Sequence, residues 1–180
     1  EREAYEAELC ATVEAEGAAL LKNENNALPL ASGAKVSLFG HGSVDLMYGG
    51  TGSGSVDTSK APNLKQALEA QGITINQTLW DLYSSDSMMS KYSRMTPASI
   101  SDTLEANTQY AVNEAPWSAL SSAESSFAEY GDAAIVVLSR SGGEGADLPS
   151  GENGTSDSWI SGQEGDGNYL ALSAEEIELL

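Results

Sequence analysis

The first part of the chain carries apolar side chains at helical spacing with acidic residues between them. Tyr5, Leu9 and Val13 recur every four residues, which predicts an amphipathic helix from residue 1 to about residue 21 with one buried face. Cys10 falls on the apolar side of this helix, so we expect it in the core. A polar turn and an extended apolar segment follow, and 1–30 is therefore predicted to be an opening helix and linker.

The next pattern is that of a strand, a glycine-rich loop, a helix and a second strand. Alternation and apolar content predict a strand at 35–39, a helix at 62–71 and a short strand at 73–75. The loop at 48–55 contains four of the chain's 18 glycines, at positions 49, 50, 52 and 54. A unit of this kind implies two parallel strands joined through the helix.

The second half of the chain contains the longest continuous apolar run. Residues 133–138 are Ala-Ala-Ile-Val-Val-Leu, which predicts a central parallel strand covered on both faces. Pro116 stands where a first-turn proline belongs, so a helix is expected from there to Gly131. The serine-rich stretch 76–115 is interpreted as helical pieces and loop. The fold class expected is α/β, a layered sandwich with a mostly parallel sheet and helices on both faces.

Charge and composition exclude several classes of function. Eight Lys and Arg against 27 Asp and Glu give a net charge of −19, which opposes binding to nucleic acid or to an anionic membrane surface. One cysteine and one histidine exclude an internal disulfide, a cysteine-rich zinc site and a multi-histidine metal centre. We expect no metal and no cofactor, and no stretch approaches the roughly 20 apolar residues of a membrane span.

A long polar segment at 139–168 follows the strand predicted at 133–138. Ligands of parallel α/β sheets bind at the carboxyl ends of the strands, so this loop is the first place to look for function. Glu144 lies between two glycines and is a candidate acid, the alternative being an idle solvated carboxylate. Asp147 could shape the loop or be a simple turn residue. Trp159, in the same loop, could stack on a sugar ring.

Two further features allow more than one interpretation. The glycine loop, with Gly50 and Ser53, could cradle a phosphate, but no Lys-Ser or Lys-Thr pair follows it, and a structural loop lining a site is favoured. His41, in a Gly-His-Gly turn, is a candidate base or ligand contact, although a solvated turn residue is the favoured interpretation. Trp117, on the amphipathic helix expected after Pro116, is expected in the core.

Three segments together resemble the α/β sandwich domain of glycoside hydrolase family 3, which contains many β-glucosidases. Residues 14–30, EAEGAALLKNENNALPL, are similar to the family's EGxVLLKNENxxLPL segment. Residues 48–54, YGGTGSG, are similar to its GGxGSG loop, and residues 141–147, SGGEGAD, to its GEGxD segment. One departure is Leu148, which stands where an arginine often follows the aspartate.

The resemblance implies an exo-glycosidase of the β-glucosidase type that works by a retaining mechanism. In that family a (β/α)8 barrel supplies an aspartate nucleophile and the sandwich supplies a glutamate acid/base, which corresponds here to Glu144. Asp147, Trp159, Gly50 and Ser53 are then expected to bind substrate or shape the loop. The expected partners are a carbohydrate substrate and a barrel domain of the same polypeptide.

Residues 1–180 are accordingly interpreted as part of the family's C-terminal-type sandwich, continuing beyond residue 180. No segment resembles the strand that bears the nucleophile, so we expect the isolated chain to be inactive. A non-catalytic carbohydrate-binding or structural domain is the alternative, and a nucleotide-binding α/β domain is a third hypothesis. Localisation is open, with an extracytoplasmic or cell-surface location favoured over the cytoplasm.

Overall fold

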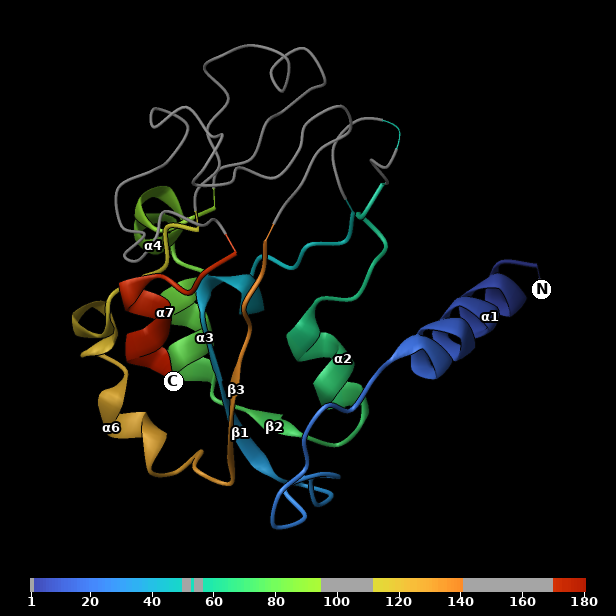
Figure 1. Ribbon diagram of the computed structural model, residues 1–180, viewed down its shortest axis with the longest axis horizontal. Coiled ribbons are helices and arrows are strands. Elements are labelled where there is room, and N and C mark those ends of the chain that lie inside the picture. Colours follow the sequence, from blue (N-terminus) through green and yellow to red (C-terminus); the bar gives the residue numbers. More distant parts are fainter. Residues whose placement is uncertain (1, 50–52, 54–56, 95–111, 141–169) are drawn as a thin grey trace. The chain divides into compact units, whose positions relative to one another are not determined.

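A computed structural model describes residues 2–49, 53, 57–94, 112–140 and 170–180. The chain divides into two compact units, Glu1–Ala31 and Ser32–Leu180. The first unit contains helix α1, Arg2–Gly17, which confirms the predicted opening helix but ends it earlier (Figure 1).

The predicted buried face of α1 is not buried. Tyr5, Leu9 and Val13 are all exposed, and Cys10 is exposed as well, so its assignment to the core was wrong. A single helix has no second element within its own unit to cover an apolar stripe. The helical period therefore identified the helix correctly but could not show what lies against it.

Three parallel strands form the sheet of the second unit. They are β1 (Lys35–Phe39), β2 (Thr74–Ile75) and β3 (Ala133–Val136), in the order β2-β1-β3. Val36 pairs with Ile75 on one side and with Ala133 on the other. The predicted parallel pairing of the first two strands is therefore confirmed, and the domain is of the α/β class.

The apolar run at 133–138 forms a strand, which is not the central one in the part of the chain that the structure describes. Among the described residues β3 lies at the edge of the sheet, and its side chains are partly buried or exposed. The centre belongs to β1, whose residues from Val36 to Phe39 are all buried. Apolar content reports on the two faces of a strand and carries no information about its lateral neighbours, which is why the prediction was wrong.

Helices cover both faces of the sheet, with α2 on one side and α3, α6 and α7 on the other (Figure 1). Side-chain caps start most of these helices: Asn63, Asn76, Ser85 and Ser173 each accept a hydrogen bond from a backbone N–H of the first turn. The bounds are α2 Leu64–Ala70, α3 Gln77–Tyr83, α4 Asp86–Lys91, α6 Glu124–Phe127 and α7 Ala174–Leu179.

The helix expected from Pro116 to Gly131 is divided into two short ones. A 3-10 helix, η3, spans Trp117–Leu120, and α6 follows. Pro116 precedes η3 with extended backbone angles, so it is not a first-turn proline. The predicted packing of Trp117 is confirmed, because its ring stacks on Phe39 with centroids 6.1 Å apart and meets Phe127 edge-on.

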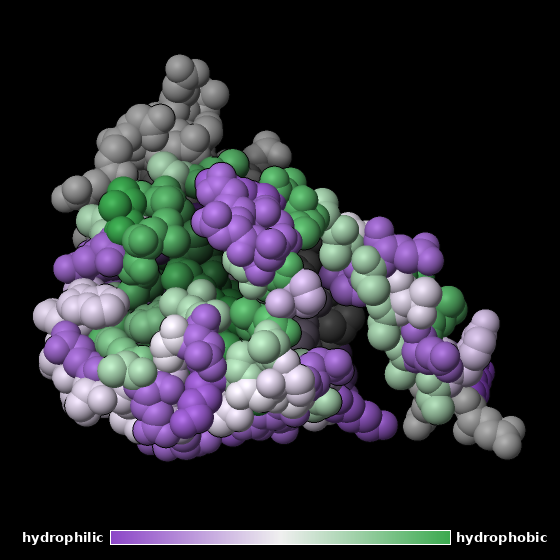
Figure 2. All heavy atoms as spheres, turned by 90° about the horizontal axis from the view of Figure 1, so that it is seen from below, coloured by the Kyte–Doolittle hydropathy of each residue, from purple (hydrophilic) through white to green (hydrophobic). Residues whose placement is uncertain are grey.

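The core lies between β1 and the helices α3, α4 and η3. Its fully buried side chains include Leu79, Tyr83 and Leu120. Hydrophobic residues also gather at the surface seen in Figure 2. Among the described residues of the second unit, the large exposed hydrophobic side chains are Tyr48, Leu138, Leu170, Ile177 and Leu180. No helix in the described part of the chain combines the length and apolar content needed to cross a membrane.

Candidate functional site at the carboxyl ends of the strands

Most of the predicted site residues lie outside the described residues. Glu144, Asp147, Trp159 and Gly50 belong to this group. Ser53 is described and is exposed. The structure does describe residues that lie just before and after the undescribed segments, and several of these meet at the carboxyl edge of the sheet.

The turn after β1 packs tightly against residues 137–140, which follow β3 and are called the β3 extension below. The 3-10 helix η1, His41–Ser43, follows β1 directly. Gly40 has a φ of 84°, and a Cβ placed on it would lie 2.8 Å from the carbonyl oxygen of Val137. A Cβ on Gly42 would lie 2.9 Å from the same oxygen. Both positions require glycine because the backbone of the β3 extension approaches too closely for any side chain.

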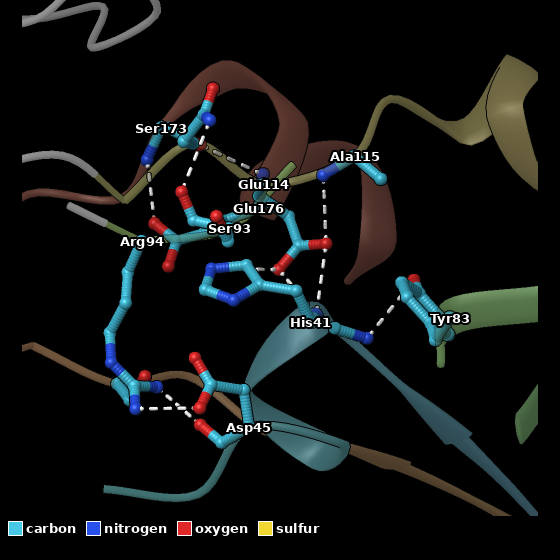
Figure 3. A network of polar contacts seen from close by, with 12 residues as sticks. His41, Asp45, Tyr83, Ser93, Arg94, Glu114, Ala115, Ser173 and Glu176 are labelled. Carbon is cyan, nitrogen blue, oxygen red and sulfur yellow. Dashed lines mark hydrogen bonds and ion pairs between the residues drawn. The ribbon is translucent and has the colours of Figure 1, made fainter. Parts of the chain in front are cut away.

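A buried acidic side chain, Glu114, holds this turn in place (Figure 3). The backbone N–H of His41 donates to both carboxylate oxygens, at 3.1 and 2.9 Å, and the N–H of Ala115 donates to one of them at 2.9 Å. On the other side, the Gly40 N–H donates to the Tyr83 hydroxyl at 3.1 Å. The turn is therefore fixed by one side chain from α3 and one from the loop that precedes η3.

The His41 ring lies 3.7 Å from Glu114, measured from Nε2 to Oε2, and both side chains are buried. Burial raises the pKa of Glu114 from 4.5 to about 7, against the lowering effect of the backbone N–H donors. Burial, followed by the charge of Arg94, lowers the pKa of His41. The distance would suit an ion pair, but both pKa directions favour the uncharged forms, and we treat the contact as neutral.

The interpretation of His41 as a solvated turn residue was therefore wrong. His41 is only 4% exposed, although a residue between two glycines is typical of an exposed turn. Buried side-chain atoms nearby, His41 Nδ1, Ser43 Oγ and Ser139 Oγ, have no hydrogen-bond partner among the described residues.

Two arginines anchor the segments that leave this edge. Arg94 donates to the carbonyl and carboxylate oxygens of Asp45 and to the carbonyl of Leu46, and these residues precede the glycine loop. Arg140 forms a two-pronged contact with Glu176, with both N–O distances at 2.6 Å. Arg140 comes just before the segment that contains Glu144, and Glu176 lies on α7, just after that segment.

No group of three or more His, Cys, Asp or Glu side chains that could hold a metal ion occurs among the residues that the structure describes. The carboxyl edge is instead a set of buried hydrogen bonds and ion pairs. Such an arrangement can fix the direction in which adjoining loops leave the sheet, and this is a requirement for placing a reactive side chain on a loop.

Comparison with known proteins identifies the family to which this fold and site belong. Residues 18–172 match the model of the glycosyl hydrolase family 3 C-terminal domain. The chain belongs to this family. The resemblance noted in the three sequence segments is thereby confirmed over most of the chain.

Two relatives of the family 3 domain carry the same enzyme name. Beta-glucosidase A of Butyrivibrio fibrisolvens is 34% identical over 146 residues, which is 78% of this chain and 15% of that protein. The crystal structure of a beta-glucosidase from Paenibacillus barengoltzii is similar with a TM-score of 0.57 and 25% identity, covering 89% of this chain and 15% of that one. The chain thus spans about 15% of the length of each relative.

Sequence reasoning missed several residues of the family 3 domain that matter at this edge. Glu114 is the one charged residue between Val112 and Pro116, and an isolated acid close to apolar residues is a usable sign of burial. The pair Ser173 and Glu176 fits the S-x-x-E capping box, which the structure confirms. Nothing in the sequence pairs Glu176 with Arg140, because the two residues are 36 positions apart.

Proposed function

We propose that this chain is one domain of a β-glucosidase-like exo-glycosidase that hydrolyses O-glycosidic bonds with retention of configuration. The observation that carries the proposal is the family 3 match over residues 18–172, together with the SGGEGAD sequence at 141–147 that begins directly after the β3 extension. The relatives named beta-glucosidase support the substrate class.

Glu144 is proposed as the general acid/base. In a retaining glycosidase one carboxylic acid protonates the leaving oxygen while a second carboxylate, about 5–5.5 Å away, attacks the anomeric carbon. The same first residue then acts as a base and removes a proton from the incoming water. The proposed nucleophile belongs to a (β/α)8 barrel of the same polypeptide, outside this chain.

The negative charge of the chain favours a glutamate that stays protonated near neutral pH. Neighbouring negative charge raises a carboxyl pKa, and so does removal from water beneath a bound sugar. The chain carries a net charge of −19, and this excess of negative charge acts in the same direction. Asp147, Trp159, Gly50 and Ser53 are proposed to shape the loop or contact the sugar.

The test is leaving-group dependence in the full-length enzyme. Glu144→Gln removes the proton donor, and only poor leaving groups need protonation. We expect kcat/KM to fall by about 100-fold or more for an alkyl β-glucoside, and by far less for a 2,4-dinitrophenyl β-glucoside in the glycosylation step.

The matched control is Glu152→Gln, the same chemical change in the same segment. We expect it to leave kcat/KM unchanged for both substrates. Equal losses on both substrates for Glu144→Gln would remove Glu144 from the acid/base role. That result would favour a non-catalytic carbohydrate-binding or structural domain.

A further inference from the structure

Helix α1 presents an apolar stripe that no described residue of its own unit covers. Tyr5, Leu9 and Val13 follow one another at four-residue spacing, so they line one face of the helix. Their exposed fractions are 66%, 48% and 63%. The opposite face carries small side chains, the alanines at positions 4, 7, 11 and 15. The stripe is therefore the face of α1 that offers the larger apolar area for contact.

A helix of this composition needs a partner to be stable. α1 has 16 residues, and isolated helices of this length are marginal in water even when their sequences favour the helix. Glu14 and Glu16 lie near its carboxyl end, where the last turn contains no basic residue and where negative charge opposes the helix dipole. Burial of the apolar stripe is the contribution that can offset these costs.

The family match points to a partner outside the sheet domain. The match begins at residue 18, directly after Gly17, the last residue of α1, and α1 falls in a separate compact unit. α1 is therefore not part of the segment that defines the family 3 domain. The chain spans about 15% of the length of its relatives, so most of a polypeptide of that length is available to contact the helix.

Charge narrows the choice of partner. Residues 2–17 contain one Arg and five Glu, and they are repelled by any strongly acidic surface. Residues 32–180 contain 6 Lys and Arg against 20 Asp and Glu, and a second copy of the chain carries the same net charge of −19. An anionic membrane is disfavoured for the same reason. The charges favour an apolar surface edged by Lys and Arg side chains.

We propose that the Tyr5–Leu9–Val13 stripe docks on the barrel domain of the same polypeptide, at an apolar patch edged by basic side chains. This inference rests on the proposed function, which supplies the barrel as a partner. Contacts of this kind between domains of one chain are common. A docked α1 would hold the start of this domain at the barrel, which restricts the relative motion of two domains that share an active site.

The first experiment maps the partner by photocrosslinking in the full-length enzyme. Tyr5 is replaced by the photoreactive residue p-benzoylphenylalanine, which keeps an aromatic ring in the stripe, and crosslinked peptides are identified by mass spectrometry. The control carries the same residue in place of Ala11, on the opposite face. We expect crosslinks from position 5 to peptides of the barrel, and little product from position 11.

Four results of the crosslinking would overturn the proposal. They are crosslinks from position 5 that are confined to residues 32–180, crosslinks to a second copy of the enzyme, equal yields from the two positions, and no crosslink at all.

The second experiment compares Leu9→Asp with Ala11→Asp by hydrogen exchange of the α1 amides in the full-length enzyme. Both variants add the same charge to the same helix and differ in the face that receives it. An undocked α1 exchanges its amides readily. We expect Leu9→Asp to lower their protection by about 20-fold or more, and Ala11→Asp to lower it by less than about fivefold. Equal losses would contradict docking through the stripe.

The leaving-group assay with Glu144→Gln separates failure of this inference from failure of the proposed function. If that variant is selective for the poor leaving group and position 5 does not crosslink to the barrel, the docking inference is wrong and the proposed function stands. If the variant slows both substrates equally and position 5 crosslinks to the barrel, the acid/base role is wrong and the docking inference stands.

Discussion

Glu114 offers a direct test of the polar arrangement at the carboxyl edge, through the substitution Glu114→Gln. The carboxyl is buried, and burial raises its pKa to about 7 from an ordinary value of 4.5. Glutamine has nearly the same shape and can still accept hydrogen bonds through its oxygen, but it does not titrate. The difference in unfolding free energy between variant and wild type therefore isolates the titration of this one group.

The sign follows from where the proton is held. Between pH 4.5 and about 7 the folded wild type keeps the Glu114 proton that the unfolded chain has released, so stability from this group falls as pH rises. At 1.36 kcal/mol per pH unit, the interval from about pH 5 to the folded pKa amounts to about 3 kcal/mol. Glu114→Gln should accordingly gain about 3 kcal/mol relative to wild type between about pH 5 and about pH 8.

The assay is urea denaturation of both proteins at several pH values across this range. Ser43→Ala serves as the control because it changes a buried polar atom beside His41 without adding or removing a titrating group, so its difference from wild type should be the same at every pH. A pH-independent difference for Glu114→Gln would refute a raised pKa for the buried Glu114 carboxyl.

Two further predictions concern folding stability and are measured by urea denaturation. Gly40→Ala should lower the free energy of unfolding by about 2 kcal/mol or more, because φ is 84° and the new Cβ would lie 2.8 Å from the Val137 oxygen. The control Gly33→Ala, with φ of 78° and nothing within 4 Å, should lower it by about 1 kcal/mol, and equal losses would argue against the close approach of the β3 extension. Asn76→Ala should lower the free energy of unfolding by about 2 to 4 kcal/mol, since Asn76 is fully buried, caps α3 and donates to Ser37 and Ser126. The control Asn63→Ala removes the exposed cap of α2 and should lower it by about 1 kcal/mol. A smaller loss at Asn76 than at Asn63 would contradict the buried hydrogen bonds of Asn76.

Local sequence patterns were sufficient to predict several helices and strands of the fold. The helices α1 and α2 and the strands β1 to β3 follow from apolar spacing and turn residues, and the parallel arrangement follows from the helix between β1 and β2. The lateral order of the strands was not available in the same way. Val36 and Ile135 are similar apolar residues, yet in the described sheet Val36 lies in the central strand and Ile135 in an edge strand.

The candidate site could be located but not assembled from the sequence. The expectation that function lies after β3 used a general property of parallel sheets, and the family resemblance identified Glu144. The contacts that organise this edge join distant positions, such as His41 with Glu114 and Arg140 with Glu176. Burial of His41 reverses what its glycine neighbours suggest, because tertiary packing by Glu114 and the β3 extension covers the turn.

The central claim, that Glu144 is the acid/base of a retaining glycosidase, is tested most directly by azide in the full-length Glu144→Gln variant. With 2,4-dinitrophenyl β-glucoside the glycosyl-enzyme forms without an acid, but water then lacks a base to activate it. Azide needs no base: it attacks the anomeric carbon and displaces the enzyme carboxylate. We predict that azide accelerates turnover and yields β-glucosyl azide, and a rate unaffected by azide with no such product would contradict the account.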